Sequence, residues 1–204
     1  RSSDLEWLRD AVVQGEEENV AALLRILSTV ARRVNFAVVR ARPFWDNIAA
    51  SLAVAGPRII NDDMAMRELL FMAIQPPRTN VPATDTAHST LVNIPLAEML
   101  LLNWRVLSHL QPAATMRVVK AMRGLLSPTN EYAKLNAARL AQAQVVSHYT
   151  FGAARHHVDH AILMESMRCL EDLLLLLPDP EAAVSDILAF VVATVPRDSD
   201  DDPS

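Results

Sequence analysis

The sequence contains little of what a β-sheet protein or a disulfide-rich protein requires. Only four glycines occur in 204 residues, and no Asn-Gly, Asp-Gly or Gly-Gly pair marks a tight hairpin. The single cysteine, Cys169, has no second thiol in the chain with which to form a disulfide. These absences argue against an all-β fold. They also favour an intracellular location, either cytoplasmic or nuclear.

Long apolar runs and an excess of positive charge are absent as well. No run approaches the roughly 20 apolar residues that span a bilayer. The net charge of -5 gives no general reason to expect nucleic-acid binding, because nucleic-acid-binding domains are usually basic. We therefore expect no membrane partner and regard nucleic acid as an unlikely one. No charged-then-apolar leader opens the sequence, which also favours an intracellular protein. Because the chain begins at Arg1 and not at Met, we expect an excised part of a larger chain or complex, with a processed chain as the alternative.

The composition is that of a globular protein, and one segment is apolar enough to lie at its centre. Apolar residues make up 51% of the chain and charged residues 21%. Residues 95–110 predict a helix that is apolar on nearly every side, with Glu98 and Arg105 on a narrow polar strip. A helix of that kind belongs in the interior, so we expect 95–110 to be the central helix.

Proline, glycine and capping residues divide the rest of the chain into further helices. We expect them at 4–14, from 16 through 30, from 43 to 56, at 62–75, at 112–126, from 127 to 152, at 154–177 and from 180 to 195. The short segment 34–42 is helical or extended. In the helix at 127–152, Leu135 is expected on the buried side. In the helix at 154–177, we expect Cys169 in the core and Glu165, Arg168 and Asp172 in a solvated ladder of ion pairs.

Residues 76–93 form the longest segment without apolar periodicity. They contain three prolines and four threonines and are expected to be an exposed, mobile loop. This loop divides a single all-helical domain, residues 1–195, into two halves. Residues 196–204 carry four aspartates and are expected to be a disordered acidic tail.

Eight or nine helices joined mostly by short turns with proline or glycine resemble an α-solenoid of the armadillo or HEAT type. The resemblance is one of architecture and implies an all-α, solenoid-like stack of helices with an extended surface for partners. An irregular globular helical bundle is the alternative architecture.

Arginine dominates the basic residues and is clustered along the chain. The interval from Met99 to Asn130 contains no acidic residue, and the exposed side predicted for the helix at 112–126 carries only positive charge. Arginine forks bind carboxylates and phosphates through two hydrogen bonds. The alternative is a solvated polar face. The candidate partner-binding residues are Arg117, Lys120 and Arg123, with a second block of Arg32, Arg33, Arg40 and Arg42.

A histidine cluster supports a different hypothesis. His156 and His160 are four residues apart, so on one helix they would share a side and present two imidazoles to a metal ion. The segment lacks the glutamate of the H-E-x-x-H motif, and a structural role at the start of an apolar helix side also fits. The chain contains no glycine-rich phosphate loop and no G-x-S-x-G motif. We therefore expect no catalytic residues, no bound metal and no cofactor.

The sequence favours a non-enzymatic protein-protein interaction module or scaffold fragment of a larger intracellular protein. Its basic helix face would bind an acidic peptide or a partner subunit. The alternative is a metal-dependent helical hydrolase centred on His156 and His160.

Overall fold

The computed structural model describes residues 42–55, 63–75, 88–108, 110–156 and 158–194. These residues are mostly helical, which confirms the all-α prediction, and the β structure among them is one antiparallel pair of two-residue strands. In chain order the elements are α3 (Arg42–Ala55), α4 (Asp63–Ala73), β1 (Ile74–Gln75), β2 (Thr90–Leu91), α5 (Ile94–Leu96), the π-helical turn η4 (Ala97–Leu101), α6 (Trp104–Leu107), α7 (Pro112–Gly124), α8 (Ala133–Gln142), α9 (Val145–Ser147), the π-helical turn η5 (His148–Gly152), α10 (Ala153–Arg155), α11 (His160–Leu176) and α12 (Glu181–Thr194). The helices expected at 4–14 and 16–30 and the tail at 196–204 lie outside the described residues.

Three helix starts agree with the proline signals in the sequence. Pro43 and Pro112 lie in the first turns of α3 and α7, where the missing N–H breaks no hydrogen bond. Asp179 precedes α12, and its Oδ1 accepts a hydrogen bond from the Glu181 N–H at 3.2 Å. These boundaries follow from local chemistry, so the sequence was sufficient to place them.

The segment expected to be the central helix is buried, but it is not one helix. Asn103 interrupts it: Nδ2 donates to the Met99 carbonyl at 3.0 Å, and Oδ1 accepts from the Arg105 N–H at 3.1 Å. A single side chain therefore ends η4 and starts α6, as asparagine does when it competes with helical hydrogen bonds. The prediction of a central position is confirmed by the buried side chains of Leu96, Leu100, Leu101, Trp104 and Leu107.

Both long helices expected in the C-terminal half are also interrupted. Gln144 adopts a left-handed backbone conformation with φ 57°, which separates α8 from α9. The expected helix at 154–177 breaks before α11, where Asp159 Oδ1 accepts a hydrogen bond from the Ala161 N–H at 2.9 Å. The expected start at 127 is wrong as well, since α8 begins at Ala133. Leu135, predicted to be buried, is 44% exposed.

The strands correct the C-terminal end of the predicted loop. Ile74 pairs with Leu91, and the Val92 N–H donates to the Ala73 carbonyl at 2.8 Å. Ser89, Leu91 and Asn93 are buried, so residues 89–93 belong to the folded core rather than to an exposed loop. Residues 76–87 lie outside the described residues, and for them the loop remains a prediction.

Asn136 of α8 completes the hydrogen bonding of β2. Its Oδ1 accepts from the Leu91 N–H at 2.9 Å, and its Nδ2 donates to the carbonyls of Ser89 at 2.9 Å and Leu125 at 3.0 Å. Arg139, one turn later, donates from Nη1 to the Leu91 carbonyl at 2.7 Å. The side chains of α8 thus occupy the edge of β2 that β1 leaves open.

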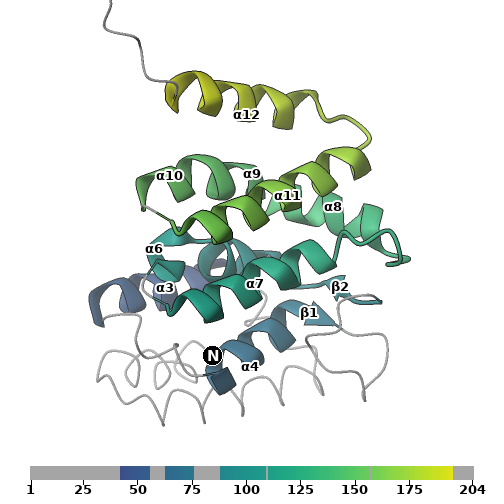
Figure 1. The fold of residues 1–204 in the computed structure, drawn as a ribbon. Coiled ribbons are helices and arrows are strands. Elements are labelled where there is room, and N and C mark those ends of the chain that lie inside the picture. The colour runs from purple at the N-terminus through teal and green to yellow at the C-terminus, as the bar shows by residue number, and fades with distance from the viewer. Residues whose placement is uncertain (1–41, 56–62, 76–87, 109, 157, 195–204) are drawn as a thin grey trace, which may run out of the picture.

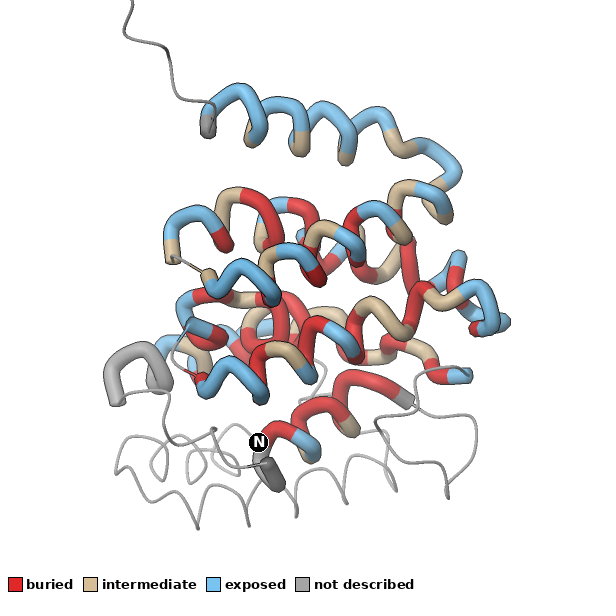
Figure 2. Tube along the Cα trace, viewed as in Figure 1, coloured by how far each residue is buried: buried red, intermediate tan, exposed pale blue. Residues whose placement is uncertain are grey.

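The helices follow one another across the molecule. Figure 1 shows α4, α7, α11 and α12 in succession across the described part of the chain, and α7 packs against both α4 and α11. Buried residues concentrate in the middle of this arrangement, whereas α12 is exposed along most of its length (Figure 2). Of these four helices, α12 therefore has an open side, whereas the described side chains of α4 are mostly buried and Arg67 is the exposed one among them.

Replacing Asn136 by alanine is expected to destabilise the fold by about 1 to 3 kcal/mol. The substitution leaves the buried Leu91 N–H without its acceptor, whereas the carbonyls of Ser89 and Leu125 keep Asn130 Nδ2 as a donor, at 3.0 and 3.3 Å. Urea unfolding measures the loss, with the exposed Gln142→Ala on the same helix as control. Equal unfolding midpoints for the two variants would show that Asn136 contributes nothing specific.

Candidate functional site

Helix α7 carries the first block of predicted partner-binding residues. Its inward side matches the sequence prediction, because Val118, Val119 and Met122 are fully buried. Arg117 and Lys120 project from the opposite side and are exposed. The basic face predicted for 112–126 therefore exists, but only in part.

Arg123 does not belong to that face. Its Nε donates to Asp172 Oδ2 at 2.7 Å, and its Nη1 donates to Glu165 Oε1 at 3.0 Å, both on α11. Arg168 adds a longer contact to Glu165 at 3.4 Å. These contacts engage the Arg123 guanidinium within the fold, so the prediction that it binds a partner loses support. The prediction of a solvated ladder on α11 is wrong for Glu165, which is 8% exposed and faces α7.

The charges in this cluster stabilise one another. Burial alone would raise the pKa of Glu165, but the hydrogen bond and charge of Arg123, with a smaller contribution from Arg168, lower that pKa below its ordinary value. The hydrogen bonds to Asp172 and Glu165 raise the pKa of Arg123 further above its ordinary value. Cys169, on the same helix, is buried as predicted, and burial raises the pKa of its thiol, which makes it unreactive.

Arg42, from the second block, is also engaged within the chain. Its Nη1 and Nη2 donate to Glu98 Oε2 and Oε1 at 2.9 and 2.8 Å, joining α3 to η4 through a two-pronged ion pair. Glu98 is 8% exposed and so is not on an open polar strip as the helical pattern implied. Arg32, Arg33 and Arg40 lie outside the described residues.

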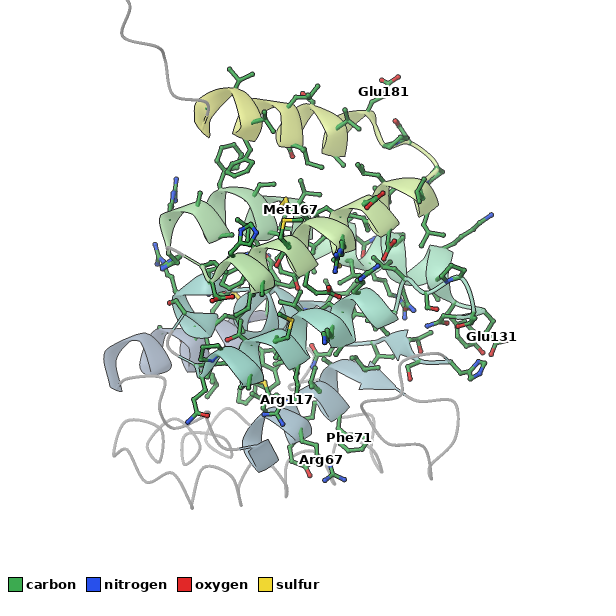
Figure 3. The ribbon with its side chains drawn as sticks, in the orientation of Figure 1. Arg67, Phe71, Arg117, Glu131, Met167 and Glu181 are labelled. Carbon is green, nitrogen blue, oxygen red and sulfur yellow. The ribbon has the colours of Figure 1, made fainter. Side chains whose placement is uncertain are left out.

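The structure adds a basic residue that the sequence reading missed. Arg67 of α4 is exposed, and α4 packs against α7. Figure 3 shows Arg67 and the partly buried Phe71 on the same side of the molecule as Arg117. Arg67 was missed because Glu68 follows it, so a search for acid-free intervals passed over α4. We refer to Arg67, Phe71, Arg117 and Lys120 as the α4/α7 surface.

The geometry that motivated a metal site is not present. Helix α10 ends at Arg155 and α11 begins at His160, so His156 and His160 do not share one side of a helix. Among the described residues, which exclude His157, no group of three or more His, Cys, Asp or Glu side chains is placed to hold a metal ion. The spacing of four in the sequence therefore does not bring two imidazoles together as a helix would.

Two aromatic residues place polar atoms deep in the core. Trp104 Nε1 and Tyr149 Oη are buried without a hydrogen-bond partner among the described residues, and the two ring centroids are 6.2 Å apart. Gly152 allows this packing, because a Cβ at that position would lie 2.8 Å from Trp104 Cδ1. Both side chains are almost fully enclosed, which makes them poor candidates for contact with a substrate.

Comparisons with protein-family models, with curated proteins and with solved structures found no match to this chain. Within the described part of the chain, no helix combines the length and apolar character needed to cross a membrane.

Replacing Arg123 by methionine is expected to cost about 1 to 3 kcal/mol of stability near neutral pH. The change leaves Glu165 and Asp172 without their main cation, and the partial exposure of Arg123 keeps the loss below that of a fully buried pair. The contribution is present above the ordinary glutamate pKa of about 4.3 and is lost as pH falls through the lower pKa of folded Glu165. Urea unfolding of the variant and wild type should therefore converge on acidification.

The exposed Lys120→Met, on the same helix, is the control for Arg123→Met and is expected to stay within about 0.5 kcal/mol of wild type. Equal losses from the two substitutions, or a difference that does not depend on pH, would contradict the assigned role of the cluster.

His148, the first residue of η5, is expected to make the fold acid-sensitive. Burial lowers its pKa from 6.5 to about 4. Between these values the unfolded chain binds a proton that the folded chain does not, so stability falls as pH falls through this window. Replacement by the non-titrating glutamine in His148→Gln should flatten the dependence of the urea midpoint on pH between about 6.5 and 4.5. An unchanged slope would contradict this assignment.

Proposed function

We propose that the chain is a non-enzymatic protein-protein interaction module, part of a larger protein or complex. In this proposal its helices stack in the manner of an armadillo or HEAT-type solenoid, and the α4/α7 surface receives an acidic peptide or partner subunit. The succession of α4, α7 and α11, each packed on the next, supports the solenoid-like interpretation.

The observation that carries the proposal is the presence of exposed cations on two helices that pack together. Arg117 and Lys120 are exposed on α7, and Arg67 is exposed on the neighbouring α4. Arg123 and Arg42 form ion pairs with carboxylates within the fold and are not part of this group. Glu68 of α4 is partly buried, which leaves cations as the more exposed charges of this surface.

The free energy that exposed ion pairs contribute indicates which kind of partner this surface could bind. Exposed ion pairs contribute about 0.2 to 1 kcal/mol each, so three of them supply at most about 3 kcal/mol. Micromolar binding requires about 8 kcal/mol, so apolar contacts must contribute most of the affinity. Phe71 is partly buried among these cations and offers such a contact. An acidic peptide that also carries an apolar anchor therefore fits better than a polyanion.

The metal-dependent hydrolase centred on His156 and His160 is less well supported than the interaction module. Its main argument was the shared helix side of the two histidines, and α10 and α11 are separate helices.

The charge-reversed variant Arg67→Glu/Arg117→Glu/Lys120→Glu is expected to bind an acidic, apolar-anchored peptide at least about tenfold more weakly than wild type, because three attractions become repulsions. Fluorescence anisotropy with a labelled peptide measures the binding. Wild-type affinity should also fall as salt approaches 1 M, where the Debye length is about 3 Å.

The matched control is Lys134→Glu, which reverses an exposed charge on α8, away from the α4/α7 surface. It should leave affinity close to wild type, and circular dichroism should show all variants folded. Equal binding by the triple variant without salt dependence would reject this surface. The next candidates would then be Arg32, Arg33 and Arg40.

A further inference from the structure

Helices α9, η5 and α10 follow one another without interruption, and the helical path breaks at both ends of them (Figure 1). We refer to residues 145–155 as the η5 segment. Gln144, just before it, has a left-handed backbone with φ 57°, a conformation that a side chain disfavours. After α10 the next helix starts again at His160. No longer helix runs through the η5 segment, so it is a separate structural unit.

Side-chain hydrogen bonds join the neighbours of the η5 segment to one another. Arg42 joins α3 to η4, Arg123 joins α7 to α11, and Asn136 joins α8 to β2. In the η5 segment, the described side-chain hydrogen bond runs from Thr150 Oγ1 to the Val146 carbonyl at 2.7 Å and stays inside the segment. No ion pair between described residues includes the segment. Within the described part of the chain, apolar and aromatic packing therefore holds it in place.

The contact between the η5 segment and α6 contains two unsatisfied polar atoms. The rings of Tyr149, in η5, and Trp104, at the start of α6, have centroids 6.2 Å apart. Tyr149 Oη and Trp104 Nε1 have no hydrogen-bond partner among the described residues, and the two side chains are 0% and 2% exposed. A buried polar group without a partner destabilises the closed arrangement and gains hydrogen bonds once water reaches it. Separation of the segment from α6 would relieve this cost.

Apolar burial opposes that separation and keeps the closed arrangement dominant. Val145 and Ala153 are buried, and the backbone at Gly152 lies so close to Trp104 that a Cβ would be 2.8 Å from its Cδ1. These contacts are a small part of the core, which extends through α4, α7, α8 and α11. Opening of the η5 segment therefore costs less free energy than unfolding of the whole protein.

We propose that the η5 segment opens as a unit, separating from α6 while β2, α7, α8 and α11 stay folded. Helix α12 moves with it, because α12 packs on α9 and η5 and the ring of Phe190 contacts that of Phe151, with centroids 5.5 Å apart. The open form exposes the Trp104 indole N–H and the Tyr149 hydroxyl to water. This device does not depend on the proposed binding function, since other side chains hold α7 in place.

Hydrogen exchange followed by mass spectrometry tests the proposal on the wild-type protein. After correction for intrinsic rates, the amides of 145–155 are expected to exchange at least about tenfold faster than those of 118–122 in α7. Urea below the unfolding transition should accelerate exchange weakly in the η5 segment and strongly in α7, because local opening exposes less surface than global unfolding. Equal protection with equal urea dependence in the two regions would overturn the proposal.

Tyr149→Phe removes the unsatisfied hydroxyl and keeps the ring. It is expected to slow exchange in the η5 segment about fivefold or more, because the closed form loses an unpaired group and the open form loses a hydrogen bond to water. Tyr132→Phe makes the same chemical change at a ring that is 37% exposed, and it should leave exchange in the segment unchanged. Circular dichroism verifies that both variants fold. Unchanged or faster exchange in Tyr149→Phe would also overturn the proposal, since it would show that closure costs this hydroxyl nothing.

Discussion

The need to satisfy buried backbone polar groups governs how this helical protein is assembled. A pair of two-residue strands leaves one edge of β2 without a strand partner, and Ser89 and Leu91 are fully buried there. Asn136 provides one acceptor and one donor for these two residues and also reaches the end of α7 at Leu125. Asn130 donates to the same carbonyls of Ser89 and Leu125, at 3.0 and 3.3 Å, so two asparagine side chains together fix the mutual position of β2, α8 and the end of α7.

Buried carboxylates, like buried backbone groups, are paired within the fold. The acids of α11 face α7, so Arg123 is used to join two helices, and the acid of η4 uses Arg42 in the same way. Arg42 and Arg168 are themselves more than half exposed and are still paired with the buried carboxylates of Glu98 and Glu165. A cluster of basic residues in a sequence therefore overstates the surface available to a partner, and the internal acids must be placed before the surface can be defined.

The sequence predicted the features that neighbouring residues determine, such as helix starts. It did not predict the features that depend on contacts between residues far apart in the chain. Helix α7, the start of α12 and the burial of the central segment follow from proline positions and apolar spacing. The interruption at Asn103 could not be read from apolar periodicity, because the residues on both sides of it are apolar. The partner of Arg42 is 56 residues away, so that ion pair requires the fold itself. Of the candidate site, Arg117 and Lys120 were anticipated, whereas Arg67 required knowledge of the contact between α4 and α7.

The burial of Trp45 and Trp104 makes their intrinsic fluorescence a probe of the core. Trp45 and Trp104 are 0% and 2% exposed, and neither α4, α7 nor α12 contains a tryptophan. Loss of the core exposes both indoles to water and shifts their emission to longer wavelengths, whereas occupation of an outer surface leaves them enclosed. With Trp7 replaced by phenylalanine, since it lies outside the described residues, the emission maximum becomes a measure of the core alone.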